Sequence, residues 1–150
     1  MTEEIERYIT EAPLDLATLL AETEDDGSGA LAVFGGTVRN KNDGRPVDGM
    51  TYDCHPSMAA KALIALEKQV IEDFGVRRCR IVHRVGPMKL GETSVWVVVR
   101  SAHRGPAMDA ARWAIDTLKV RLPVWKEEHY IDGESRHLDG TPLVTPGSDT

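Results

Sequence analysis

The stretch ETSVWVVVRSAHRGPAMDAARWAIDTLKVRLPVWKEEHYI, residues 92–131, decides the fold because it reads as a strand, a helix and a strand in direct succession. Residues 95–99 are all apolar, which indicates a central strand that is buried on both faces. Pro106 suits a first helical turn, and residues 105–122 repeat apolar side chains at helical spacing. Residues 123–131 are predicted to form the last strand. The expected core stripe of the helix is Met108, Ala111, Ile115, Leu118 and Leu122.

A second long helix and four further elements are predicted upstream of this stretch. The helix begins at Pro56, keeps apolar residues at helical spacing and stops at Gly75, a residue type that favours helix ends. We expect residues 47–55 to form a strand that pairs with the strand before it. Two main helices packed on one mixed or largely antiparallel sheet are therefore the expected arrangement, which is an α+β fold. The other predicted elements are a helix at 14–24 and strands at 30–39 and 77–86.

The whole chain, residues 1–150, is expected to form a single domain, since 150 residues suffice for one hydrophobic core. Within it, residues 1–27 are read as an N-terminal helix followed by an acidic segment. Residues 138–150 are polar and rich in turn-forming residues, so they are predicted to be a flexible tail.

The composition narrows the classes of function. A formal net charge of −6 argues against binding nucleic acid through bulk electrostatics. No apolar run reaches the length of a membrane span, and the acidic start lacks the apolar core of a signal peptide, so the expected location is the cytoplasm. Cys54 and Cys79 make neither a disulfide framework nor a metal-binding spacing. Basic residues at a few isolated positions in this acidic chain indicate that it binds a small anionic ligand or the acidic tail of a partner.

His103 and Arg104 stand between the buried strand and the first turn of the helix at 105–122. Unpaired N–H groups at a helix start attract anions, so His103 and Arg104 could form a binding site for a phosphate or an oxyanion there. The alternative is a solvated loop with a capping histidine. Spacing alone leaves both interpretations open.

Two lysines near the end of the stretch are also ambiguous. Lys119 borders the core stripe of its helix, so it either extends along the apolar surface to reach solvent or enters a cleft. Strand alternation puts Lys126 and Glu128 on one face and Trp125 on the other. If Trp125 packs inward, Lys126 is expected to face away from the core as part of an exposed ion pair. Arg39 follows the paired glycines Gly35 and Gly36, which allow a close approach of backbone or ligand.

Taken together, the motifs are more specific than any one of them. The segments GALAVFGGTVRNKNDGRPV, YDCHPSMA, IVHRVGPMKLGE and VVVRSAHRGPAMDAARWAIDTLKVRLPVWKEE follow one another at fixed spacings. This series resembles the large, catalytic subunit of molybdopterin synthase over residues 29–136. The resemblance thins beyond Glu128 and assigns no role to Arg136.

The resemblance implies a fold, a reaction and partners. The fold is an α/β hammerhead of the α+β type. The reaction installs the two dithiolene sulfurs of molybdopterin on cyclic pyranopterin monophosphate. The sulfur is carried as a thiocarboxylate on the C-terminal Gly-Gly tail of a small ubiquitin-like subunit, so neither a metal nor another cofactor is required. The implied assembly is a heterotetramer built on a homodimer of the large subunit.

The resemblance also implies roles for individual residues. Lys119 and Lys126 match the catalytic lysines, and Phe34 matches an aromatic residue near the partner's tail. Thr37 stands where some members have a basic residue, which removes one possible contact but spares the backbone. Cys54 and His55 stand where His and Tyr are common, a departure that is not expected to affect the chemistry. The residues that match the substrate-binding set are Thr37, Val38, Arg39, His103, Arg104, Lys119, Lys126, Glu127 and Glu128.

The implied chemistry agrees with the physics of charge. A phosphate and a thiocarboxylate repel each other, so a site that joins them needs several fixed cations. Arg suits phosphate through its fork geometry, whereas the pKa of a lysine among other cations falls toward the working pH. A non-catalytic scaffold that binds the tail of a ubiquitin-like partner remains the alternative. A phosphate-ester hydrolase is less favoured, because the sequence offers no metal cluster and no nucleophile motif.

Overall fold

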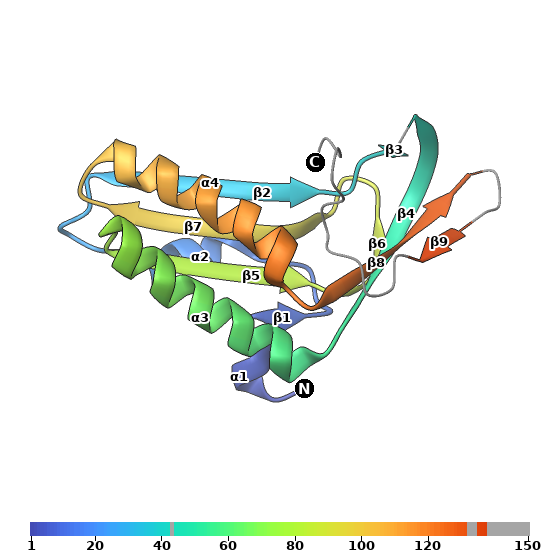
Figure 1. Cartoon of the computed structure of the whole chain (residues 1–150), viewed down its shortest axis with the longest axis horizontal. Coiled ribbons are helices and arrows are strands. Elements are labelled where there is room, and N and C mark those ends of the chain that lie inside the picture. The colour runs from blue at the N-terminus through green and yellow to red at the C-terminus, as the bar shows by residue number, and fades with distance from the viewer. Residues whose placement is uncertain (43, 132–134, 138–150) are drawn as a thin grey trace.

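The computed structural model describes residues 1–42, 44–131 and 135–137 (Figure 1). The predicted flexible tail, residues 138–150, lies outside these ranges. No helix within them is long and apolar enough to span a membrane. The helices are α1 (Glu3–Glu6), α2 (Leu16–Glu22), α3 (Pro56–Phe74) and α4 (Arg104–Arg121), and the strands are β1 (Ile9–Thr10), β2 (Ala30–Thr37), β3 (Lys41–Asn42), β4 (Arg45–Cys54), β5 (Arg78–Arg84), β6 (Gly86–Lys89), β7 (Thr93–Ser101), β8 (Val124–Tyr130) and β9 (Ser135–His137).

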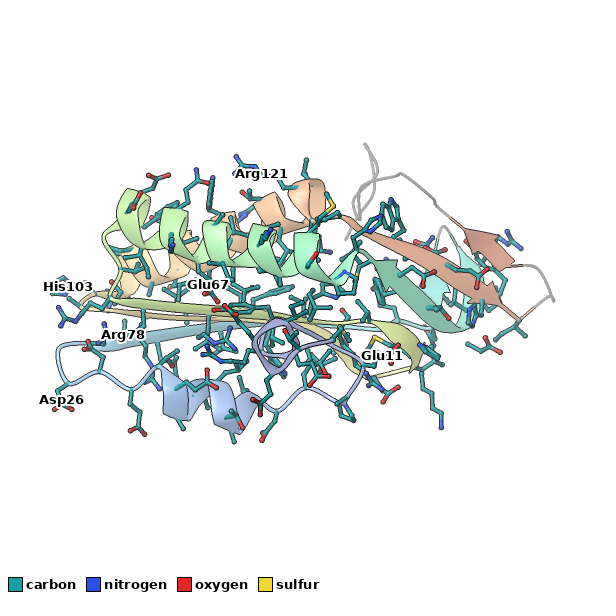
Figure 2. The ribbon with its side chains drawn as sticks, turned by 90° about the horizontal axis from the view of Figure 1, so that it is seen from below. Glu11, Asp26, Glu67, Arg78, His103 and Arg121 are labelled. Carbon is teal, nitrogen blue, oxygen red and sulfur yellow. The ribbon has the colours of Figure 1, made fainter. Side chains whose placement is uncertain are left out.

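The first sheet has the strand order β1-β5-β7-β2. Strand β7 pairs antiparallel with both β5 and β2, whereas β1 runs parallel to β5, so the sheet is mixed. The central position predicted for the apolar run is confirmed, since Val97, Val98 and Val99 are completely buried. Helices α3 and α4 cover one face of this sheet and α2 covers the other (Figures 1 and 2).

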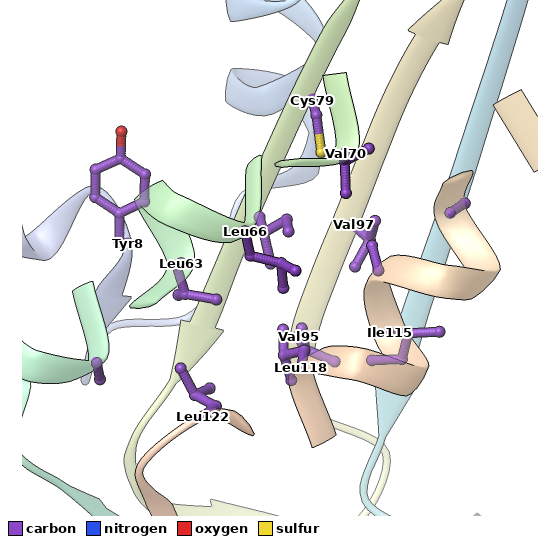
Figure 3. Close-up of a cluster of buried hydrophobic side chains, with 14 of the residues drawn as sticks. Tyr8, Leu63, Leu66, Val70, Cys79, Val95, Val97, Ile115, Leu118 and Leu122 are labelled. Carbon is purple, nitrogen blue, oxygen red and sulfur yellow. The ribbon is translucent and has the colours of Figure 1, made fainter. Parts of the chain in front are cut away.

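The main core lies between the two long helices and the first sheet. Leu63, Leu66 and Val70 of α3 meet Val97 of β7 and Leu118 of α4 there (Figure 3). On the opposite face, a smaller cluster forms where Leu19 of α2 packs against Val82 and Val98. The ends of α3 agree with the sequence, because the helix begins at Pro56 and closes at Gly75, which adopts a φ of 65°.

The core stripe predicted for α4 needs one correction. Met108 is 64% exposed, whereas Ala111, Ile115, Leu118 and Leu122 are buried as expected. The buried face is shifted toward small residues, Ala107, Ala110 and Ala114. Alanines allow the helix to approach the sheet closely, so the larger Met108 is left at the edge of the contact.

The strand predicted at 47–55 exists, but its predicted partner is wrong. Strand β2 pairs with β7, and β4 instead enters a second sheet with the order β3-β4-β8-β9. Strand β6 also pairs with β4, at residues 49–52 of β4. The molecule therefore has two sheets where one was expected. The chain leaves the first sheet after Thr37, and the polar loop at 40–46 forms a short hairpin, β3–β4, that starts the second sheet.

A buried ion-pair cluster connects β5 to the helices. The Arg80 guanidinium lies 2.9 Å from Oε2 of Glu22 on α2 and 3.2 Å from Oε2 of Glu67 on α3. It also donates to the Arg7 carbonyl at 2.7 Å. The Glu67 carboxylate accepts a further hydrogen bond from the Ile81 amide at 2.8 Å, although its burial still raises the pKa of Glu67.

We expect Arg80→Met to lower the free energy of unfolding by about 3–5 kcal/mol, because Glu67 would remain buried without its charge partner. Urea unfolding followed by circular dichroism measures this loss. The matched control is Arg78→Met, whose exposed side chain should contribute less than about 1 kcal/mol. An Arg80→Met variant as stable as the control would contradict the importance of the cluster.

Candidate functional site

A cavity of about 270 Å³ lies where the end of β2, the last turns of α4 and strand β8 meet. Among the described residues that line it, the charged side chains are all cationic: Arg39, Lys41, Lys119 and Lys126. Its walls also include Phe34. Three of these cations come from the positions that the sequence singled out. They are separated by up to 87 positions in the chain, and the fold brings them to one site.

Lys119 enters the cavity from the last turn of α4. It is half-buried beside Leu118 and Ile115, so it borders the core stripe as expected. Burial lowers the pKa of Lys119, and the neighbouring charges of Lys126 and Arg39 lower it further. The interpretation of Lys119 as a lysine in a cleft at the edge of the core is therefore favoured.

Strand β8 does not have the orientation that an inward-packed Trp125 would give. Its buried face carries Val124, Glu128 and Tyr130, and Lys126 lies between them with a side chain that is only 13% exposed. Trp125 is on the other face, where its ring meets the His55 ring edge-on at 5.8 Å. The reason is that β8 pairs with β4 in the second sheet, whose inner face borders the cavity.

The predicted pair of Lys126 with Glu128 is confirmed, but it is not an exposed surface pair. Lys126 Nζ lies 3.4 Å from Oε1 of Glu128, and Glu128 is 1% exposed. Glu127 points away from this pair and lies 3.3 Å from Nε2 of His129. The structure thus brings Glu128, but not the side chain of Glu127, to the buried side of β8.

The segment at the end of β2 contributes mainly Arg39. Val38 is buried and its backbone is already engaged, since its N–H donates to the Glu92 carbonyl at 3.0 Å and its carbonyl accepts from the Gly91 N–H at 2.9 Å. Thr37 and Arg39 are exposed on either side of it and line the cavity. Of the paired glycines, Gly35 makes room for the Trp96 ring, which a Cβ at that position would overlap.

His103 and Arg104 are not near this cavity within one chain. His103 precedes α4 and Arg104 is its first residue, both exposed, and His103 makes no side-chain capping bond. Lys119 follows Arg104 by 15 residues, which at 1.5 Å per residue is about 23 Å along the helix axis. Figure 2 has His103 at the end of the molecule remote from β8.

His83 and Tyr52 also line the cavity, and sequence reasoning assigned neither to a site. The His83 ring is 2% exposed, and its Nδ1 lies 2.6 Å from the Arg84 carbonyl. Burial lowers the pKa of His83 to about 4, so the imidazole is neutral at physiological pH. The Tyr52 ring packs edge-on against it at 5.1 Å, and burial raises the pKa of Tyr52. The only signal in the sequence is that His83 directly follows the apolar residues Ile81 and Val82 of β5.

Metal ligation is not supported by the described part of the chain. Residues 1–42, 44–131 and 135–137 contain no group of three His, Cys, Asp or Glu side chains that could hold a metal ion. Arg136 lies on β9, opposite Glu128 in the backbone register.

Comparisons with known proteins agree with the resemblance. A molybdopterin synthase catalytic subunit from Nostoc sp. is 40% identical over 128 residues, which cover 85% of this chain and 78% of that protein. One from Emericella nidulans is 36% identical over 137 residues, covering 88% and 70%. The crystal structure of molybdopterin synthase from Staphylococcus aureus superposes with a TM-score of 0.83 at 28% identity, covering 91% of this chain and 98% of that one. The family model described as MoaE protein matches residues 9–121, and the chain belongs to this family.

Proposed function

We propose that this chain is the catalytic subunit of a molybdopterin synthase. It transfers sulfur from the C-terminal thiocarboxylate of a small ubiquitin-like subunit to cyclic pyranopterin monophosphate and so forms the dithiolene of molybdopterin. The observation that carries the proposal is the cavity whose charged lining residues, in the part of the chain that the structure describes, are all cationic. We expect the reaction to occur in the cytoplasm, where Cys54 and Cys79, both free thiols, stay reduced.

The cations divide the work according to their chemistry. Arg39, exposed at the end of β2, offers a planar fork suited to the substrate phosphate, and Lys41 adds a second charge beside it. Lys119 and Lys126 lie deeper and hold the thiocarboxylate against the repulsion of the phosphate. They also stabilise the negative charge that develops on the tail's carbonyl oxygen in the tetrahedral intermediate. Phe34 provides an apolar wall for the tail.

His103 and Arg104 take part in this site only if a second copy of the chain supplies them. The helix holds them about 23 Å from the Lys119 of their own chain, by the rise of 1.5 Å per residue. Phosphate recognition by the His–Arg pair at a helix start therefore requires the homodimer. This requirement makes the homodimer part of the active site.

The edge of the first sheet is suited to such a dimer. Strand β2 is an edge strand, and Val33 on it is 39% exposed beside a groove of about 500 Å³ that Met108 of α4 also lines. The start of β2 lies near the start of α4, since Ala30 pairs with Ser101, and its end leads to Arg39. Two copies paired antiparallel along β2 would bring the α4 start of one to the cavity of the other.

We expect Val33→Asp to convert the dimer into monomers and to lower activity with it. Because the interface is two-fold symmetric, the substitution would place one unpaired carboxylate from each copy in it. An unpaired buried charge costs about 2–5 kcal/mol. Sedimentation velocity measures the mass. Met58→Asp is the matched control, because Met58 is an exposed apolar residue on α3 away from β2. A dimeric, active Val33→Asp variant would rule out this interface.

Reconstitution tests the function itself. The purified chain is mixed with a thiocarboxylated small subunit and the cyclic pterin phosphate, and dithiolene formation is assayed. We expect the amount of dithiolene formed to be set by the amount of thiocarboxylate supplied, because each dithiolene needs two sulfurs. Binding of the small subunit without product would instead support the scaffold interpretation.

A further inference from the structure

We propose that Asn42 and Tyr130 are positioning residues for Lys126 and that they act through the carboxylate of Glu128. The proposal rests on the catalytic role proposed above for Lys126. Neither residue was singled out by the sequence, and Tyr130 does not line the cavity. Asn42 does line it, so only the effect of Tyr130 on the reaction must be indirect.

The geometry divides the two oxygens of Glu128 between two tasks. Oε2 accepts hydrogen bonds from the Asn42 amide and from the Tyr130 hydroxyl, each at 2.5 Å. Oε1 is fully buried, has no hydrogen-bond partner among the described residues, and lies 3.4 Å from Lys126 Nζ. Two donors on Oε2 fix the plane of the carboxylate, and this leaves Oε1 as the oxygen that faces the lysine.

The burial of Glu128 explains why two donors are needed. A carboxylate that is 1% exposed has lost its water, and hydrogen bonds to the charged form must replace it. Oε1 at 3.4 Å attracts Lys126 without a short hydrogen bond. The ammonium group thus remains available to a ligand in the cavity.

The two donors also connect separate parts of the site. Asn42 belongs to β3, in the loop that carries Arg39 and Lys41, whereas Tyr130 follows Glu128 by two residues on the same face of β8. Arg45, the register partner of Asn42, lies over the Tyr130 ring at 3.8 Å. These contacts hold the loop against β8. The Glu128 carboxylate thereby positions Lys126 on β8 and also the loop that carries Arg39 and Lys41.

Loss of either donor should release the carboxylate to rotate toward Lys126. The ammonium group would then be held by both oxygens and drawn away from the cavity. A displacement of about 1 Å at a catalytic group costs up to about 100-fold in rate, and we expect a fall in kcat of about tenfold or more for Tyr130→Phe. The KM for the pterin should change by less than about twofold, since Tyr130→Phe keeps the Asn42–Glu128 hydrogen bond that holds the segment with the phosphate-binding Arg39.

A double-mutant cycle in the reconstituted enzyme tests the inference. Tyr130→Phe, Glu128→Gln and the double variant are compared by single-turnover kinetics, with Asn42→Ala as a second route to the same loss. If Tyr130 acts through Glu128, its substitution should lower kcat by less than about twofold when Glu128 is already Gln. Equal, multiplicative losses in both backgrounds would overturn the proposal. Tyr8→Phe is the control for a non-specific loss of stability, because Tyr8 is a buried tyrosine away from the cavity.

Lys126→Ala in the same assay distinguishes a failure of the positioning role from a failure of the catalytic role of Lys126. If Lys126→Ala is inactive while Tyr130→Phe and Asn42→Ala have full activity, the positioning role is wrong and the role of Lys126 stands. If Lys126→Ala has full activity, the catalytic role of Lys126 is wrong and the positioning role is overturned with it.

Discussion

Replacing Lys119 by alanine is expected to reduce dithiolene formation by about 1,000-fold or more, the loss expected when a charge-stabilising or proton-transferring group is removed. Lys119 is the lysine that α4 inserts into the cavity, where the charges of Lys126 and Arg39 lower its pKa further after burial has lowered it. On balance the fold disfavours its charged form, because burial and the charges of Lys126 and Arg39 outweigh the attraction of Asp116. The variant should therefore unfold at the same urea concentration as the wild type or a higher one.

The pH dependence gives a second readout for Lys119. A lowered pKa means that the folded protein loses this proton at a lower pH than an ordinary lysine does. If the ammonium form holds the thiocarboxylate, the rate should be highest below that pKa and fall as the pH rises through it. Arg121→Ala serves as the control, since Arg121 is an exposed cation of the same helix. Full activity of Lys119→Ala would contradict the catalytic role.

The elements of this fold could be read from local patterns, because helix ends and apolar periodicity act over a few residues. Pro56 and Gly75 delimit α3 as expected, and the apolar run at 95–99 is the interior strand. Strand pairing was missed because alternation indicates which faces are buried but not which strand lies alongside. The β3–β4 hairpin, which diverts the chain into a second sheet, leaves only a polar loop in the sequence.

The orientation of Lys126 illustrates the same limit at the site. Alternation correctly separated Trp125 from Lys126 and Glu128, yet it could not say which set faces inward. An exposed Lys126 depends on an inward Trp125, and alternation does not establish that condition. The opposite arrangement holds because Glu128 has donors from Asn42 and Tyr130, and the Asn42 donor comes from 86 residues away. A contact of that range has no periodic signature.

His103 and Arg104 belong to the same sequence motif series as Lys119, but they lie far from Lys119 in a single folded chain. Their motif adjoins that of Lys119 in the sequence, but the helix between them is rigid, and its length excludes a shared ligand within one chain. If they bind the substrate of the Lys119 cavity, each active site is made of two copies. Active sites shared between two copies would give an experimental result that no site formed within one chain could give.

Mixed dimers of Arg104→Ala and Lys119→Ala chains are expected to regain activity that neither variant has alone. In a mixed dimer, the intact Lys119 cavity of the Arg104→Ala chain meets the intact Arg104 of the other chain. Random pairing gives mixed dimers in half of the population with one intact site of two, so about a quarter of wild-type activity should return. Mixing Lys119→Ala with Lys126→Ala is the control, because both lysines line the same cavity and no intact site can form. Recovery in the first mixture alone requires sites shared between copies, whereas no recovery in either would mean that Arg104 serves its own chain or none.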